Sequence, residues 1–424
     1  MNLALSIPEP FLSQLKFIEA RIASAGHECF LVGGSVRDLY MGKIPAEYDL
    51  TTSARPELIK SLFKSVIETG IKHGTVTILH EKCPYEITTY RIDKDYTDGR
   101  HPDQVEFGSS LLEDLRRRDF TMNALALNLI TGEIIDHHNG KTDIDNRIIR
   151  TIGNPIHRFS EDGLRPIRAM RFASVLNFEI EKDTRLAIRE SKKITAKISV
   201  ERLQDEILKS LKGNSPSTML KLFIEEDILS LFVNDFQMET RGALEESNLS
   251  VLDKIPKTNP GYQIGVWAFS LGPLVSSTKW ESWLQKLKFS NAIVKDAVFV
   301  LTLIHLSKAQ SSPVDDYEIR KNFLVPIKKH LEQRRLVVFP VWSVLEVFSW
   351  NWLERGIILW EENPPLLLSD LAINGKDIEQ LFPTLPKPRY GELLHFLLDQ
   401  VWRMPENNQK PYLRKQCDYF LSNM

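Results

Sequence analysis

Strand-like segments are confined to the part of this chain before Pro155, and the later segments have helical periodicity. Short apolar runs bounded by turn residues predict strands. They lie at residues 29–32, 48–51, 75–79, 86–90 and 133–135. Apolar residues at helical spacing predict helices at 11–22 and 56–63. This order predicts an α+β chain, with a small mixed sheet and flanking helices followed by an all-α remainder.

The helical remainder is interrupted by clusters of Gly, Pro, Asn and Ser that are typical of linkers. These breaks lie at residues 213–216, 259–261, 311–313 and 363–365. A chain of 424 residues exceeds the size at which one hydrophobic core keeps growing. We therefore expect four domains: a head (1–146), a helical neck (147–213), a helical body (214–312) and a helical tail (313–424).

Composition restricts the partners and the compartment. The 54 Lys and Arg nearly balance the 56 Asp and Glu, so a polyanion would have to meet a local basic patch. The longest apolar run, residues 297–306, is about half of the ~20 residues that span a bilayer, so no membrane segment is expected. The N-terminus has no basic start followed by an apolar stretch, which argues against secretion. Three distant cysteines suit a reducing cytoplasm.

A glycine pair follows the first predicted strand, in the segment Leu-Val-Gly-Gly-Ser-Val-Arg-Asp at residues 31–38. Backbone N–H groups at glycines can converge on an anion, and the guanidinium of Arg37 can form paired hydrogen bonds with phosphate oxygens. The segment is a candidate phosphate cradle. A plain turn is the alternative for the dipeptide alone.

Two acidic residues, Glu47 and Asp49, stand two positions apart in the next predicted strand, which places both on one face. Paired carboxylates suit Mg²⁺, which is usually held by one or two carboxylates and by substrate phosphates. Glu86, in another predicted strand, could reach the same ions. The alternative is that these acids lie on a solvated strand face.

Two arginine-rich segments complete the candidates. Arg116, Arg117 and Arg118 precede Asp119, ahead of an apolar run at 122–129 that we expect to be helical. Further along, side chains recur every three residues in a pattern that predicts one ridge of a helix. They are Asp162, Arg165, Arg168 and Arg171. Charge runs are often solvated surfaces, but the excess of arginine near the acidic pair favours a functional site.

The ordered series of motifs resembles the class II tRNA nucleotidyltransferases, relatives of bacterial poly(A) polymerases among the polymerase-beta-like nucleotidyltransferases. The resemblance covers most of the chain, and the series is far more specific than any one motif. It rests on residues 31–38, 47–54, 86–91, 100–102, 114–124 and 161–172, with weaker similarity at 199–206 and 371–377.

The resemblance implies a nucleotidyltransferase head, a base-recognising neck and a tRNA-binding tail. The implied reaction adds C and A from CTP and ATP to the tRNA 3′ end with Mg²⁺ and releases pyrophosphate. Glu47, Asp49 and Glu86 would be catalytic, the first two as metal ligands. Triphosphate binding is implied for Gly33, Gly34, Ser35 and Arg37, and sugar and phosphate positioning for Arg118 and Asp119. Asp162 and Arg165 would select the base, with Arg168 and Arg171 continuing toward the phosphates.

One departure from the family pattern concerns the metal pair. The family usually has Asp at both positions, whereas this chain has Glu47 at the first. The longer side chain implies a rearranged ion site or lower activity. A catalytically impaired RNA-binding homologue is therefore an alternative of another class.

Other members of the family add only CC, only the terminal A, or a poly(A) tail. The Gly-Arg-Arg segment and strongly basic tail of poly(A) polymerases are absent from this sequence. The loop at 96–107, part of which CC-only enzymes tend to lack, is complete. CCA addition is therefore favoured, with A-only addition second, and the sequence favours no particular oligomeric state.

The helical part is the expected tRNA surface. Two local basic groups lie there, but each is more typical of an ordinary solvated face. They are Lys328, Lys329, Arg334 and Arg335, and Lys376, Lys387 and Arg389. The aromatic residues of the same region are expected mainly in the core. They are Trp342, Phe348, Trp350, Trp352 and Trp360.

Overall fold

The computed structural model describes residues 3–94, 104–108, 110–234, 236, 246–310 and 314–422. Parts of two sequence features, the loop at 96–107 and the break at 311–313, lie outside these residues, and so does the motif at 100–102. The chain forms two compact units, residues 1–237 and 238–424. The finer division into four domains stays a prediction.

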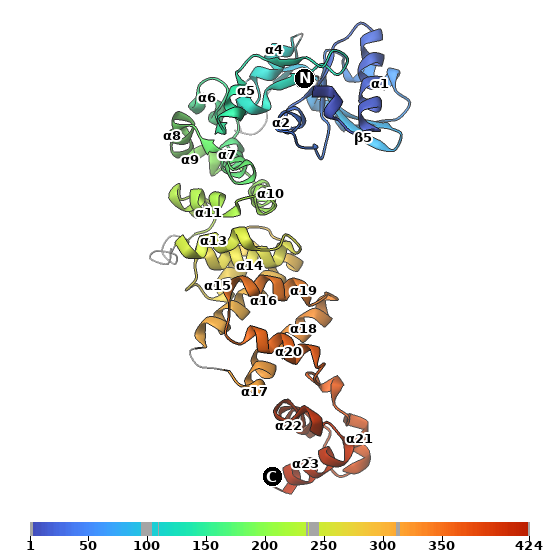
Figure 1. The fold of residues 1–424 in the computed structure, drawn as a ribbon, viewed down its shortest axis with the longest axis vertical. Helices are drawn as coiled ribbons and strands as arrows, with labels where there is room; N and C mark the ends of the chain where they lie inside the picture. The colour runs from blue at the N-terminus through green and yellow to red at the C-terminus, as the bar shows by residue number, and fades with distance from the viewer. Residues whose placement is uncertain are drawn as a thin grey trace. The chain divides into compact units, whose positions relative to one another are not determined.

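A seven-stranded mixed sheet forms the centre of the first part of unit 1 (Figure 1). Its strand order is β3-β4-β5-β2-β1-β8-β9. The central strand β1 pairs antiparallel with β2 and β8, and β2 pairs parallel with β5. The strands are β1 (Cys29–Val32), β2 (Leu50–Thr52), β3 (Val66–Gly70), β4 (Thr75–His80), β5 (Cys83–Thr89), β8 (Leu125–Leu127) and β9 (Ile134–Asp136). The predicted mixed sheet with flanking helices is confirmed.

Two of the predicted elements differ from the structure. The apolar run at 122–129 is not a helix, because it forms a 3-10 turn (Thr121–Asn123) and then the fully buried strand β8. All three residues of β8 are buried, so both faces of the strand are covered and its sequence lacks the polar alternation that identifies a half-exposed strand. The strand expected at 48–51 begins only at Leu50, so Glu47 and Asp49 precede it.

Smaller strands pair outside the main sheet. Strands β6 (Arg91–Lys94) and β7 (Gln104–Phe107) form a hairpin, and β10 (Ile148–Ile149) pairs in parallel with β11 (Glu179–Ile180). The expectation of no strand after Pro155 is therefore wrong for β11. A strand of two residues is too short to give a periodic signal in the sequence.

Apart from these short strands, the rest of unit 1 that the structure describes is helical. Helix α7 packs against α10 and α11, so its outer ridge is held by buried contacts on its other side. The helices of unit 1 are α1 (Phe11–Ser24), α2 (Gly34–Tyr40), α3 (Pro56–Leu62), α4 (Leu111–Arg116), α5 (Gly140–Asp145), α6 (Pro155–Glu161), α7 (Leu164–Leu176), α8 (Lys182–Glu190), α9 (Lys192–Thr195), α10 (Val200–Leu211) and α11 (Pro216–Glu225).

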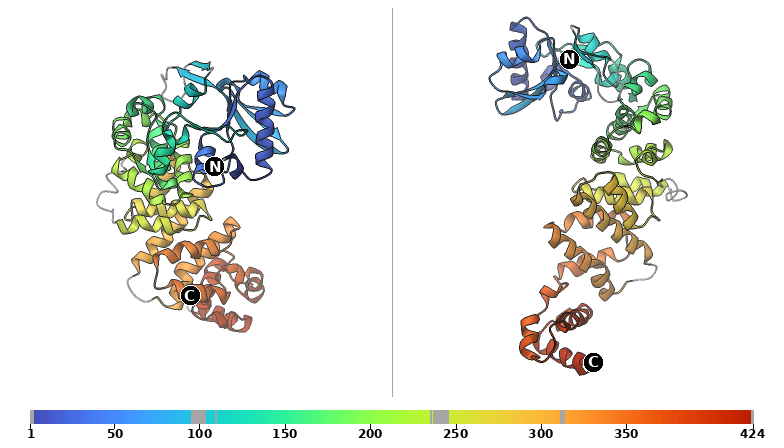
Figure 2. Two further views of the ribbon diagram at one scale, coloured as in Figure 1. Left: turned by 45° about the horizontal axis from the view of Figure 1, so that its top comes forward. Right: turned by 180° about the vertical axis from the view of Figure 1, so that it is seen from behind.

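Unit 2 is helical throughout the part that the structure describes, and both views of Figure 2 show the large sheet only in the N-terminal part of the chain. Its helices are α13 (Glu246–Lys254), α14 (Pro260–Leu271), α15 (Ser277–Lys286), α16 (Asn291–Ala309), α17 (Asp316–Ile319), α18 (Val325–Arg334), α19 (Phe339–Leu345), α20 (Leu353–Glu361), α21 (Gly375–Leu381), α22 (Arg389–Arg403) and α23 (Lys410–Ser422).

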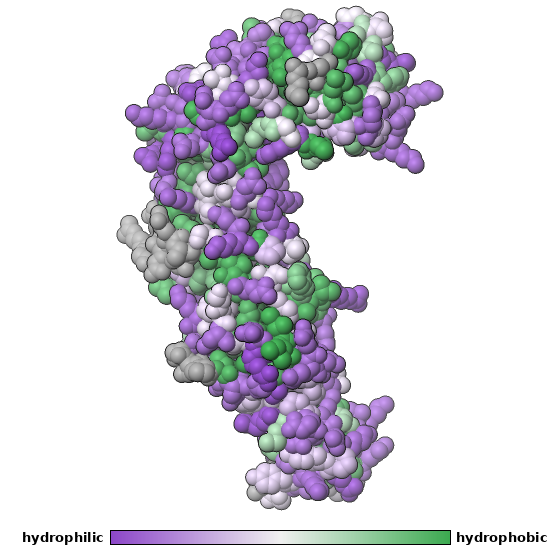
Figure 3. Space-filling model, viewed as in Figure 1, coloured by the Kyte–Doolittle hydropathy of each residue, from purple (hydrophilic) through white to green (hydrophobic). Residues whose placement is uncertain are grey.

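Aromatic side chains contribute to the core of unit 2. Trp342 and Trp352 are buried as expected, and Trp352 stacks on Phe323 at 3.9 Å between ring centroids. Phe348, Trp350 and Trp360 are half-buried. Hydrophilic side chains cover most of the face in Figure 3. Among the described residues, no helix is both long enough and apolar enough to cross a bilayer.

Several members of the two basic groups in unit 2 form ion pairs. Arg334 binds the buried Asp296 at 2.8 Å between Nε and Oδ1, and Lys328 binds Asp370 at 2.9 Å. Lys387 pairs with Glu379 at 3.1 Å. These carboxylates offset much of the positive charge, which supports the interpretation of these groups as ordinary surface.

Candidate active site

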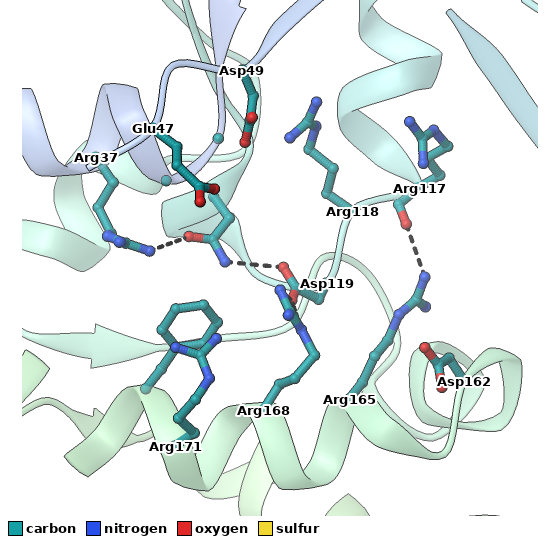
Figure 4. Close-up of a pocket in the computed structure, with 14 residues that line it drawn as sticks. Arg37, Glu47, Asp49, Arg117, Arg118, Asp119, Asp162, Arg165, Arg168 and Arg171 are labelled. Atoms are coloured by element: carbon teal, nitrogen blue, oxygen red, sulfur yellow. Dashed lines mark hydrogen bonds and ion pairs between the residues drawn. The ribbon is translucent and has the colours of Figure 1, made fainter. Parts of the chain in front are cut away.

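A cavity of about 500 Å³ lies in unit 1, between the end of β1 and the helix α7 (Figure 4). Four separate segments of the chain supply its walls, with six arginines against four acids. We call it the first cavity. It is lined by Gly33, Gly34, Arg37, Glu47, Asp49, Arg117, Arg118, Asp119, Asn123, Asp162, Arg165, Arg168, Arg171 and Phe172. Its size is within the range of about 300–1,000 Å³ that is usual for ligand sites.

The glycine pair forms the turn between β1 and α2. Gly33 has φ of 76°, and a Cβ added there would lie 2.9 Å from Nη1 of Arg118. The positive φ favours glycine, and a Cβ at this position would require the Arg118 guanidinium to move. The sequence therefore predicted the turn correctly, and the structure adds a steric reason for it.

Arg37 and Ser35, the other two residues predicted to bind phosphate, have protein partners. The Arg37 guanidinium lines the cavity and donates to Asp38 and, at 2.7 Å, to Oδ1 of Asn123. The Ser35 hydroxyl donates to the carbonyl of Val32 at 2.8 Å and does not line the cavity.

Glu47 and Asp49 project into the cavity from the extended segment that leads into β2 (Figure 4). The buried Tyr48 between them points to the other side, as expected for an extended backbone. The same-face prediction is thus retained although the strand begins two residues later than expected. The pKa of Asp49 is raised to about 6. The largest cause is desolvation by the surrounding protein, and the negative charges of Glu86 and Glu47 add to it.

The acidic group has the chemistry of a divalent-cation site. Its ligand atoms are all carboxylate oxygens, which Mg²⁺ prefers. A bound cation would relieve the repulsion between the negative charges of these carboxylates. Glu86 does not line the first cavity, but it acts electrostatically on Asp49 from the adjoining strand β5. Within the described ranges, no three His, Cys, Asp or Glu side chains are arranged as a complete metal site.

The arginine segment between α4 and β8 is held by a buried carboxylate. Asp114 accepts hydrogen bonds from Arg117 at 2.7 Å and from Arg118 at 3.3 Å. Burial by itself would raise the pKa of Asp114, but the two arginines lower it below its usual value. Asp114 therefore holds the guanidinium groups of the two arginines that border the cavity.

Asp119 joins this segment to α7. Its Oδ2 accepts from Arg168 at 2.8 Å, and its Oδ1 accepts from Asn123 at 3.1 Å. Asn123 in turn accepts from Arg37, so these residues form a continuous chain of hydrogen bonds across the cavity (Figure 4). Burial opposes ionisation, yet Arg168 and Asn123 lower the pKa of Asp119 to about 2.

Asp162 and Arg165 are close in the cavity but are not on one helical ridge. Asp162 ends α6 in an extended conformation, and α7 begins at Leu164, so only Arg165, Arg168 and Arg171 follow the predicted ridge. Arg202 binds both Asp162 oxygens, at 3.0 and 2.7 Å. The sequence analysis did not identify Arg202, because its partner lies 40 residues away.

Arg165 is oriented by its neighbours in a similar way. Its Nη1 donates to the carbonyl of Arg158 at 2.8 Å and to the carboxylate of Glu161, and its Nη2 donates to the carbonyl of Arg117 at 3.1 Å. These three bonds leave one Nη2 hydrogen and the Nε hydrogen available.

Phe172 forms an apolar wall that the arginines surround. The guanidinium of Arg171 lies 3.8 Å from the ring centroid, and those of Arg37 and Arg168 lie at 5.2 and 5.4 Å. Arg171 also forms an ion pair with the buried Glu206. Phe172 and Asn123 were not identified as site residues from the sequence, since neither type carries a charge or a metal-ligand pattern.

Comparison with known proteins identifies the family. Residues 29–150 match the family model "Poly A polymerase head domain", and 177–238 match "Probable RNA and SrmB- binding site of polymerase A". The CCA-adding enzyme of Bacillus pumilus is 34% identical over 423 residues, which cover 98% of this chain and 99% of that protein. The chain belongs to the CCA-adding enzyme family. The enzyme of Enterococcus faecalis is 35% identical and is covered to 91%.

Solved structures agree with this assignment. The CCA-adding enzyme of Bacillus stearothermophilus in complex with CTP superposes with a TM-score of 0.76 at 28% identity, covering 98% of this chain and 100% of that one. The Thermotoga maritima enzyme complexed with tRNA has a TM-score of 0.65 at 17% identity, which supports the fold, with 99% of this chain and 98% of that one covered. The expected family and fold class are confirmed.

Gly33→Ala tests whether the close approach of Arg118 shapes the cavity. Gly42→Ala is the matched control, because Gly42 has a similar φ of 72° but nothing within 4 Å of an added Cβ. Both changes should lower the free energy of unfolding by about 1–2 kcal/mol through the positive φ. Only Gly33→Ala should also weaken CTP binding, by about tenfold or more, in a calorimetric titration. Equal CTP affinities in the two variants would contradict this role of Gly33.

Proposed function

We propose that this chain is a tRNA nucleotidyltransferase that adds CCA to the tRNA 3′ end from CTP and ATP. The observation that carries the proposal is the meeting of Glu47 and Asp49 with a glycine turn and an arginine-lined wall in one cavity. Full-length similarity to CCA-adding enzymes supports the same substrates. The Glu47 carboxylate borders the cavity together with Asp49, so we favour an active enzyme over an impaired homologue.

The proposed reaction is an in-line displacement at the α-phosphate of the nucleotide. The 3′-hydroxyl oxygen of the tRNA forms a bond to the α-phosphorus, and the bond from this phosphorus to the oxygen shared with the β-phosphate breaks. Pyrophosphate and the proton of the hydroxyl group are released. The residues of this chain bind the two substrates and place the reacting atoms close together.

Glu47 and Asp49 would hold Mg²⁺, with Glu86 as an additional carboxylate in electrostatic range. When bound there, such ions supply charge neutralisation for the attacking and leaving oxygens. Their charge also favours the ionised form of Asp49, whose pKa without a cation is about 6.

The triphosphate would lie against the Gly33–Gly34 turn and the arginines around it. Gly33, Gly34 and Arg118 line this part of the cavity, and a guanidinium can form paired hydrogen bonds with phosphate oxygens. Arg168 already forms an ion pair with Asp119. The two side chains together would therefore orient the ribose of the nucleotide. Phe172 offers the ribose or the base an apolar surface.

Asp162 and Arg165 would select the base. A carboxylate accepts from the exocyclic amine of cytosine or adenine, and a guanidinium donates to the adjacent ring nitrogen. Uracil and guanine present a carbonyl beside an N–H, which reverses both requirements. Arg202 and the Leu164 N–H fix the Asp162 carboxylate and leave a lone pair on its Oδ2, so one rigid pair could admit C and A and reject U and G.

We infer that tRNA is the second substrate, as in the Thermotoga maritima CCA-adding enzyme of the same fold, which has been solved in complex with tRNA. Cys29, Cys83 and Cys417 are free thiols, which suits a reducing cytoplasm.

Extension of a tRNA that ends at its discriminator base tests the proposal. With CTP and ATP together, the product should be three nucleotides longer; CTP alone should add two residues, and UTP or GTP should add almost none. Asp49→Asn should lower the rate by about 10³-fold or more, because the cation-binding carboxylate is lost. The product is read on a gel at single-nucleotide resolution.

Asp145→Asn is the matched control, since Asp145 accepts a hydrogen bond from Tyr40 outside the cavity. It should leave the rate within about twofold, as is usual for a surface substitution. Addition of A alone to tRNA ending in CC, with no use of CTP, would contradict CCA addition. Binding of tRNA without any incorporation would contradict the enzymatic function.

Asp162→Ala should reduce the selectivity among bases while the protein stays folded. Losing the acceptor for the exocyclic amine should lower the ratio of CTP to UTP incorporation by about 10–100-fold, as expected for one base-reading contact worth about 1–3 kcal/mol. Steady-state kinetics with each nucleotide measures this ratio. Asp205→Ala, in which an exposed acid paired with Lys209 is removed, is the control. An unchanged ratio in Asp162→Ala would remove Asp162 from base selection.

A further inference from the structure

A second cavity of about 350 Å³ borders the same acidic pair. Glu47 and Asp49 line both cavities, and Glu86 lines only the second. A reaction between two substrates needs two binding places that meet at the reacting atoms. The first cavity accounts for the nucleotide, so the second is available for the other substrate.

The second cavity forms where two strands of the sheet separate. The β2–β5 ladder begins at the pair Leu50↔Ile87, and the preceding segments, 46–49 and 83–86, both line the cavity. Aromatic side chains give it an apolar wall, because Tyr48 and Tyr85 are buried and Phe11 packs on Tyr48 at 5.4 Å between ring centroids. Flat apolar rings of this kind suit a nucleobase or a ribose.

One polar group in this wall, the Tyr48 hydroxyl, is unpaired among the residues that the structure describes. Its oxygen is buried. Buried hydroxyl groups in folded proteins nearly always have a partner, so an exception beside a cavity points to a polar ligand or to ordered water.

A single cation lies at the same cavity. His80 pairs with Cys83 across a two-residue turn, and the turn residues Glu81 and Lys82 have φ of 49° and 72°. Turns of this type normally contain Asn or Gly, so two long charged residues here carry strain, which is typical of functional positions. Among the described carboxylates, none forms an ion pair with Lys82, which leaves its charge available to a phosphate.

We propose that the second cavity binds the 3′-terminal ribonucleotide of the acceptor RNA. Its base and ribose would pack against Phe11 and Tyr48, its phosphate would meet Lys82, and its 3′-hydroxyl would face Glu47 and Asp49. This inference rests on the proposed function, because it assigns a place to the second substrate of that reaction.

Cys83 provides a direct probe of occupancy. It lines the second cavity and is half-buried, whereas Cys29 and Cys417 are buried, so it should be alkylated first. The rate of Cys83 alkylation by iodoacetamide is measured by mass spectrometry for the protein alone, with CTP, with tRNA ending at its discriminator base, and with the same tRNA shortened at its 3′ end. Cys83→Ser confirms which thiol reacts.

Only the intact acceptor should protect the thiol. At ten times its Kd it should slow Cys83 alkylation about tenfold, whereas CTP or the shortened tRNA should leave the rate nearly unchanged. An unchanged rate with an intact tRNA that is bound and extended would refute the acceptor site while leaving the proposed function in place. Failure of the wild-type protein to extend tRNA would instead refute the function itself.

Lys82→Gln supplies a second measurement, with Lys64→Gln as the control. Lys64 is exposed in the same unit and lines neither cavity. Lys82→Gln should raise KM for the acceptor RNA about three- to tenfold, leave KM for CTP unchanged, and reduce the salt dependence of acceptor binding by about one phosphate contact. Equal acceptor KM values in the two variants would overturn the role of Lys82.

Discussion

The ionised Asp119 carboxylate connects the parts of the chain that form the first cavity. It is 8% exposed, and it receives hydrogen bonds from Arg168 on α7 and from Asn123 beside β8. A buried carboxylate without these donors would carry a large desolvation cost, so the interaction favours a position of α7 beside the segment that carries Asp119. Together with the packing of α7 on α10 and α11, this pair holds the arginines of α7 at the cavity.

The same principle explains why an arginine-rich site can be well ordered without its ligand. Each arginine that borders the cavity on this side has a fixed protein partner, as Arg117 has in Asp114 and Arg171 has in Glu206. Partners of this kind reduce the side-chain entropy that a ligand would otherwise have to overcome. The remaining donors are then directed at one place, where a triphosphate would bind.

Local sequence signals predicted most of the first unit. Strand β1 and the turn at Gly33 followed from an apolar run and two glycines, and the acidic pair followed from its spacing. The run at 122–129 was misassigned because a strand covered on both faces has no alternation. Arg202 and Asn123 could not be found in this way, since their roles depend on Asp162 and Arg37, which are distant in the sequence.

The most direct test of the account is a crystal structure with CTP and Mn²⁺, in which anomalous scattering locates the ion. We expect Mn²⁺ bonded to Glu47 and Asp49, with the CTP phosphates against Gly33, Gly34 and Arg118 and the base beside Asp162 and Arg165. An ion and a triphosphate bound elsewhere, with both carboxylates turned to solvent, would contradict the account.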